Sequence, residues 1–65
     1  MNIIGIDVET KFKNNLIRRL NKLKAVDFVS DGGAYRQDES YSKVYVKTTM
    51  AEGDLDNWLY RGGLK

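Results

Sequence analysis

The side chains best suited to chemistry in this chain are carboxylates. Asp7 and Glu9 stand one residue apart at the end of an alternating apolar stretch, so both would lie on one face of a strand, where they could hold a divalent cation. The remaining acids do not follow the ligand spacing of a calcium-binding loop. The chain has no His and no Cys, which removes the commonest general base at neutral pH and any thiolate ligand or nucleophile. We therefore expect no catalytic residue, no metal site and no cofactor.

The segment Asp7-Val8-Glu9-Thr10 resembles the first motif of the DEDD-type 3′–5′ exonucleases, in which a strand ends in Asp-x-Glu-Thr. The resemblance implies a metal-dependent nuclease. Such a site needs further acids on later elements and, typically, two metal ions. A chain of 65 residues has no room for the larger core of that family. We interpret the two acids as solvated residues at a strand end, and we expect no enzymatic activity.

Positive charge is concentrated in one segment, from residue 11 to residue 24. This segment holds six basic residues and no acid, which leaves 5 basic and 9 acidic residues elsewhere, a net charge of −4. The whole chain is only +2. Charge sorted in this way is typical of a surface that meets a partner, although a solvated helix that keeps a small protein soluble is the plainer alternative.

Two sets of residues are the predicted partner-binding sites. On a helix over 11–24, one polar stripe would lie opposite the leucines, with amide and cationic donors that suit phosphates or an acidic protein surface. A second row lies on the best predicted strand, where an aromatic ring between two cations suits stacking on single-stranded nucleic acid or a protein interface. The first set is Lys11, Asn15, Arg18 and Lys22, and the second is Lys43, Tyr45 and Lys47.

Two amphipathic helices are predicted to position these residues. Apolar residues recur every three or four positions from Phe12 to Leu23, with Thr10 as the N-cap and Lys22 and Lys24 in the last turn. A shorter helix follows Thr49, which with Glu52 matches a capping box. That helix ends at Gly62-Gly63, and its Trp58 is expected to fill the core between helix and sheet.

Three strands are predicted from alternating residues, at 3–9, 26–30 and 41–49. Asp31-Gly32-Gly33 is expected to form a turn or the start of a loop, and residues 34–40 to form either more strand or a loop. The resulting β-α-β-β-α order predicts one small α+β domain over residues 1–65, with a single-layer sheet and both helices on one face. This order resembles a ferredoxin-like unit that lacks its last strand.

These features favour a non-catalytic binding protein that modulates a protein partner. Short chains without proline or cysteine are typical of virus-encoded accessory proteins, phage proteins among them, that bind a host factor. The alternative is a nucleic-acid-binding protein that uses the basic helix 11–24 and the row Lys43, Tyr45 and Lys47. Self-association as a homodimer is a further option, because a domain this small has a marginal core and an open sheet edge. The lack of cysteine and of a long apolar run favours the cytoplasm and no membrane partner.

Overall fold

The structure is a computed structural model that describes residues 1–63, and it has a three-stranded antiparallel sheet with two helices. The elements are β1 (Asn2–Glu9), α1 (Thr10–Asn21), β2 (Val26–Ala34), β3 (Tyr41–Thr48) and α2 (Glu52–Trp58). A wider helical turn, η1 (Leu59–Gly63), continues from α2. The predicted α+β class is confirmed.

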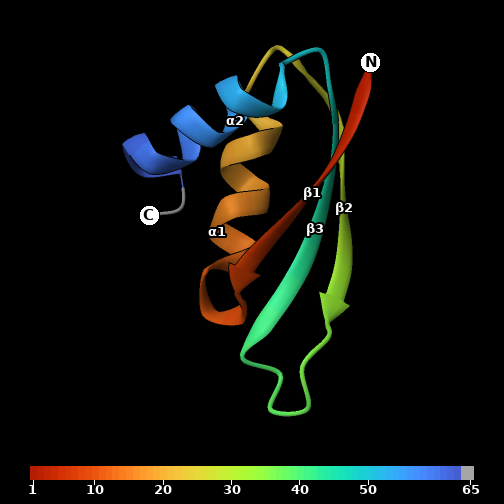
Figure 1. The fold of residues 1–65 in the computed structure, drawn as a ribbon, viewed down its shortest axis with the longest axis vertical. Coiled ribbons are helices and arrows are strands. Elements are labelled where there is room, and N and C mark those ends of the chain that lie inside the picture. Colours follow the sequence, from red (N-terminus) through yellow and green to blue (C-terminus); the bar gives the residue numbers. More distant parts are fainter. Residues whose placement is uncertain (64–65) are drawn as a thin grey trace.

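The last strand in the chain, β3, lies in the middle of the sheet. Both β1 and β2 pair with it antiparallel, so the strand order is β1-β3-β2. The register places Ile4 opposite Val46 and Ile6 opposite Val44, which brings the apolar residues of both strands to the same face. In Figure 1 both helices lie to the left of the strands.

The core lies between this sheet face and the helices. Leu16 and Leu20 of α1 and Leu55 of α2 are fully buried in one cluster with the valines and isoleucines of β1 and β3. Each strand contributes alternate residues, as the pleat requires. The buried residues of the cluster are Ile4, Ile6, Val8, Leu16, Leu20, Val44, Val46 and Leu55.

The helix ends differ from the sequence-based expectation. Glu9 is the N-cap of α1, so Thr10 is the first helical residue, and its hydroxyl donates to the Glu39 carbonyl oxygen at 2.6 Å. Because that proton is used, the buried Ser42 hydroxyl is the donor in its 2.9 Å contact with Thr10. The predicted N-cap residue therefore ties the helix start to the loop before β3.

Two further boundaries are corrected. The first helix ends at Asn21, so Lys22 is its C-cap and Lys24 lies outside it, while Arg18 and Arg19 occupy the last turn. The predicted capping box does not form, because Ala51 is the N-cap of α2 and no side chain caps that helix. Thr49 follows the end of β3, and its hydroxyl instead donates to the Ala25 carbonyl oxygen at 3.4 Å.

The second strand is longer than predicted. It runs through Gly32 and Gly33 to Ala34 with a register shift after Asp31, and Gly33 takes a φ of 81° there. The Asp31 carboxylate accepts the Gly33 N–H at 2.8 Å, which stabilises this irregular step in place of a turn. Residues 35–40 form the loop between β2 and β3.

Thr48 is the buried polar residue that joins two connections. Its hydroxyl is completely buried, donates to the Ala25 carbonyl oxygen at 2.8 Å and accepts the Met50 N–H at 3.1 Å. The segment before β2 and the segment after β3 are therefore held by the same side chain. A hydroxyl in this position costs little, because both of its hydrogen-bonding roles are satisfied.

We predict that Thr48→Val lowers the free energy of unfolding by about 1–3 kcal/mol, because it leaves the Met50 N–H without its acceptor in the interior. Thr49→Val is the matched control, since Thr49 is exposed and its hydroxyl contact is long. That variant is expected to stay within about 0.5 kcal/mol of the wild type. Chemical denaturation followed by circular dichroism measures both values, and equal losses in the two variants would contradict the role given to Thr48.

Candidate functional site

The face of the sheet turned away from the core is the first candidate site, and we call it the outward sheet face. The alternation that buries Val44 and Val46 turns their neighbours on β3 to this side, and β1 and β2 contribute residues in register with them. Its members are Ile3, Gly5 and Asp7 of β1, Phe28, Ser30 and Gly32 of β2, and Lys43, Tyr45 and Lys47 of β3.

One row across this face is apolar at both ends. Lys47 is in register with Ile3 on one side and with Phe28 on the other. Ile3 is 70% exposed and Phe28 is 49% exposed. The structure thus leaves a large aliphatic and a large aromatic side chain in solvent, one on each side of a lysine.

Tyr45 lies at the centre of the face and is 43% exposed. Its ring extends over the glycines of both neighbouring strands, since a methyl group built on Gly5 would lie 3.4 Å from Cε1 and one built on Gly32 only 2.8 Å from Cε2. The two glycines leave room for the ring to lie across the sheet. A flat aromatic surface of this kind is suited to contact with another molecule.

Lys43 is held by an acid rather than left available for a ligand. Its Nζ lies 2.6 Å from an Asp7 carboxylate oxygen and 5.6 Å from the centre of the Tyr35 ring. The hydrogen bond from Lys43 is the main cause of the lowered pKa of Asp7, and the same contact raises the pKa of Lys43. Of the two predicted lysines in the row, Lys43 is therefore largely neutralised.

The predicted stripe on the first helix lies elsewhere. The four residues of the stripe are all exposed, and helical periodicity puts them on the side opposite Leu16 and Leu20, whereas the row on β3 lies on the side of the sheet turned away from the buried core. The stripe is Lys11, Asn15, Arg18 and Lys22. The sheet and the core separate the two predicted sets, so the fold does not bring them together. They are two distinct surfaces.

The tertiary contacts also reduce the charge of the basic segment. Lys13 lies 3.0 Å from an Asp31 carboxylate oxygen of β2, and this contact is the main cause of the lowered pKa of Asp31. Lys11 packs over the Phe12 ring, with Nζ 5.2 Å from its centre. Of these two cations, Lys13 is therefore neutralised, whereas Lys11 remains exposed and keeps its charge.

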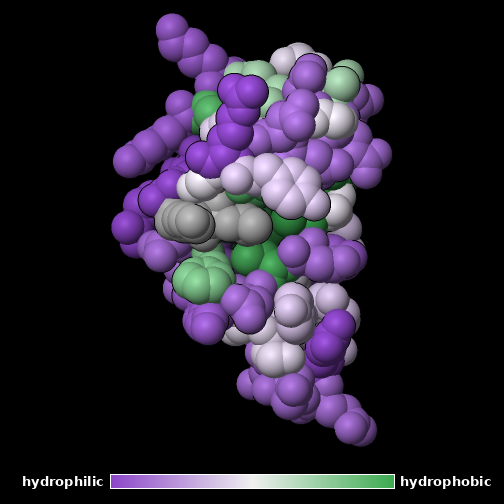
Figure 2. Space-filling view, turned by 60° about the vertical axis from the view of Figure 1, so that its left-hand side comes forward, coloured by the Kyte–Doolittle hydropathy of each residue, from purple (hydrophilic) through white to green (hydrophobic). Residues whose placement is uncertain are grey.

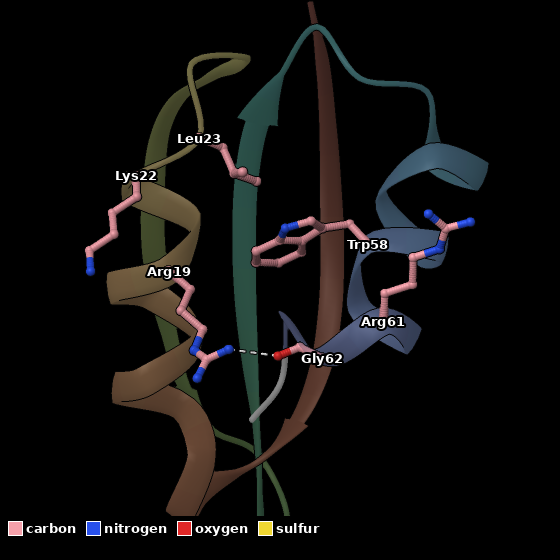
Figure 3. Close-up of a pocket in the computed structure, with 6 residues that line it drawn as sticks. All are labelled: Arg19, Lys22, Leu23, Trp58, Arg61 and Gly62. Atoms are coloured by element: carbon pink, nitrogen blue, oxygen red, sulfur yellow. Dashed lines mark hydrogen bonds between the residues drawn. The ribbon is translucent and has the colours of Figure 1, made fainter.

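A pocket of about 340 Å³ between the end of α1 and the end of the α2–η1 unit was not predicted. Arg19 crosses it and donates from Nη1 to the Gly62 carbonyl oxygen at 2.7 Å (Figure 3). Trp58 packs against the core, as expected, but its indole also forms part of the pocket wall. Arg61 carried no sequence signal, because only the fold brings η1 to the end of α1. The lining residues are Arg19, Lys22, Leu23, Trp58, Arg61 and Gly62.

Figure 2 shows the helix side of the molecule. Its surface is mainly hydrophilic, and hydrophobic residues reach it in a small area near the middle. Within residues 1–63, no group of three or more acids is placed to hold a metal ion. No helix in the same part of the chain is long and apolar enough to cross a bilayer.

Comparison of the chain with protein-family models, with curated proteins and with solved structures gave no match. The candidate sites are therefore defined by their own geometry.

We predict that Gly32→Ala lowers the free energy of unfolding by about 1–3 kcal/mol, because the added methyl group would lie 2.8 Å from the Lys43 carbonyl oxygen and would displace Tyr45. Gly53→Ala is the matched control in α2, where a methyl group meets nothing within 4 Å. It should raise stability by about 0.5–1 kcal/mol, since alanine favours the helix. Thermal unfolding of both variants tests the pair, and a neutral Gly32→Ala would contradict the close packing of Tyr45.

A second prediction concerns the stability of the fold at low pH. The pKa values of Asp7 and Asp31 lie below the ordinary 3.8, chiefly because Lys43 and Lys13 donate to them, so each contact stabilises the fold above that value. The stabilisation is lost as the pH falls through the lower folded pKa. Asp7→Asn combined with Asp31→Asn should therefore be less stable than the wild type at neutral pH and should lose less on acidification. Urea unfolding between about pH 6 and about pH 2 measures this, and parallel curves would contradict it.

Proposed function

We propose that this is a non-catalytic binding protein that uses its outward sheet face to bind a protein partner. The observation that carries the proposal is the exposure of Ile3, Phe28 and Tyr45 on three adjoining strands. Large apolar side chains that are exposed together on one face commonly mark an interaction site. Aromatic side chains of this kind are also the usual anchors of protein interfaces.

The charges on the face favour a protein over nucleic acid. Binding to phosphates depends on cations that can replace the counterions of the nucleic acid. Asp7 already neutralises Lys43, and it would repel a phosphate placed nearby. Ile3 at the edge of the row has no aromatic face on which a base could stack. Lys47 lies between the two apolar ends of its row, and the other lysine of the face, Lys43, is paired with Asp7.

This arrangement implies the chemistry of the partner. The partner surface would present apolar side chains to Ile3, Phe28 and Tyr45, and a carboxylate near Lys47. Charge pairing at such a point contributes more to orientation and to association rate than to affinity. Burial of the apolar side chains would contribute most of the affinity, at about 25 cal/mol for each Å² removed from water.

The fold itself supports a role in binding. Because β3 lies between β1 and β2, we propose that the domain is the split β-α-β unit of a ferredoxin-like fold without its last strand, with both helices on one face. Within residues 1–63, β1 then has one unpaired edge next to the exposed Ile3. A partner could add a strand to this edge and cover the outward sheet face at the same time.

The alternative is binding of DNA or RNA. It is favoured by the exposed stripe Lys11, Arg18 and Lys22 on α1, which is separate from the outward sheet face. This function predicts an affinity that falls steeply with salt, with a log–log slope near −0.9 per neutralised phosphate of duplex DNA. A second copy of the chain is the other occupant of the outward sheet face to be tested. Whichever partner it binds, we propose that this is a small accessory protein of the kind that viruses encode and that it acts in the cytoplasm.

We predict that Phe28→Ser and Ile3→Ser each weaken binding of the partner by about tenfold or more, because each removes an exposed apolar anchor. Affinity capture from the native cell, with and without nuclease treatment, identifies the partner, and calorimetry with the purified partner measures the loss. Both residues are exposed, so the variants should remain folded.

Tyr60→Ser is the matched control, because Tyr60 is an aromatic residue on η1 that is 91% exposed and lies outside the outward sheet face. It should bind the partner as the wild type does. Sedimentation equilibrium tests the homodimer, which Phe28→Ser should dissociate if a second copy is the partner. Undiminished binding by both sheet variants would overturn the proposal, and capture that is lost on nuclease treatment would favour the nucleic-acid alternative.

A further inference from the structure

The pocket between α1 and η1 differs from the outward sheet face in its chemistry. Three of its six lining residues are cations, Arg19, Lys22 and Arg61, and none is an acid. The two ion pairs found within residues 1–63 involve Lys13 and Lys43 and no residue of the pocket. The like charges repel one another, so an anion placed among them would be attracted by all three.

The α1 helix places a weak opposing charge nearby. The C-terminal end of a helix carries about half a negative charge, which Arg19 and Lys22 already offset. The three formal charges of the lining residues exceed it several times over.

Arg19 is the best-placed donor. Its bond to the Gly62 carbonyl oxygen uses one of the five N–H groups of the guanidinium and orients the others. The bond is possible because Gly62 has a φ of 115°, which turns the chain back toward α1. An anion could therefore bind to a group that is already held in place, with little further loss of side-chain freedom. In Figure 3 Lys22 and Arg61 lie on opposite sides of the pocket with their charged ends directed away from Trp58, so each would have to turn to reach a ligand.

The remaining wall is apolar. Figure 3 shows the Trp58 indole between α1 and α2, with Leu23 above it. Trp58 is half-buried and supported by the core, so it is a firm surface with part of its ring system still accessible. An indole beside cations suits a planar ligand that carries negative charge, because the ring can stack while the charge is paired.

We propose that this pocket binds a small phosphate monoester that carries an aromatic ring, with the phosphate between Arg19 and the rim cations and the ring against Trp58. A phosphate monoester carries close to two negative charges at neutral pH, whereas a carboxylate carries one. The phosphate therefore matches a site with three cations better. The volume of about 340 Å³ lies at the lower end of the range for small-molecule sites, as a ligand of this size requires. A nucleotide and any other phosphorylated aromatic compound share this chemistry.

The experiment uses phenyl phosphate as the probe and the whole chain as the protein. Trp58 is the only tryptophan, so its fluorescence reports directly on the pocket. We expect a saturable change with phenyl phosphate, binding that is about tenfold weaker with inorganic phosphate and no saturation with phenol. A mononucleotide titrated in parallel should bind if nucleotides are the natural source of the ligand, and a failure to bind would assign the site to other aryl phosphates.

Substitutions distinguish specific binding in the pocket from nonspecific attraction of anions to the basic helix. Arg19→Gln and Lys22→Gln should each weaken phenyl phosphate binding by about tenfold, because each removes a charged donor. Arg18→Gln is the matched control, since Arg18 adjoins Arg19 on α1 but does not line the pocket. It should bind as the wild type does.

Three results would overturn the proposal. These are the absence of saturation with phenyl phosphate, equal affinity for inorganic and phenyl phosphate, and an equal loss in Arg18→Gln and Lys22→Gln. Lys22 is exposed and is not one of the buried residues, so Lys22→Gln is expected to remain folded and its loss to report on binding. The test is independent of the outward sheet face, which Phe28→Ser changes without affecting the pocket.

Discussion

Val44 and Val46 of β3 are completely buried beneath Leu16 and Leu20 of α1, and the other elements are arranged around this contact. The strand that carries the two valines is the central one, so its backbone is paired on both sides. A domain of 65 residues has only a small core, and loss of this packing would remove a large part of it. The position of β3 therefore decides where β1, β2 and the helices can lie.

The same strand generates the outward sheet face. Successive side chains of a strand point to opposite sides, so the pattern that buries Val44 and Val46 also turns Lys43, Tyr45 and Lys47 away from the core. On that second side, large side chains such as Phe28 remain in solvent. The core and the candidate interface therefore both follow from the alternation of side chains along β3.

Charge is distributed by the tertiary structure more evenly than the chain suggests. Asp31 of β2 pairs with Lys13, and Asp7 of β1 pairs with Lys43, so acids from distant segments neutralise two cations. Arg19 is drawn to the Gly62 carbonyl, and Arg61 is carried to the same pocket. The remaining positive charge thus lies in two places, the exposed stripe of α1 and the pocket at its end.

Regular local features were predicted well from the chain alone. The spacing of Leu16 and Leu20 indicated a helix, and the alternation through Val44, Val46 and Thr48 indicated a strand, because both patterns depend only on neighbours within a few residues. The ends of the elements were less accurate. Thr10 is a residue type that is common at N-caps, but its hydroxyl donates to the Glu39 carbonyl oxygen, which the fold brings close to it.

Other features depended on contacts between distant segments. The path of β2 through Gly32 and Gly33 follows from pairing with β3, which outweighs the local tendency of two glycines to form a turn. The pocket around Trp58 exists only where the end of α1 meets η1. The sequence by itself therefore determined the α+β class, the amphipathic faces and the residues available for binding. Only the tertiary structure decided which charges are paired and which side chains share a surface, because these depend on the register and approach of segments far apart in the chain.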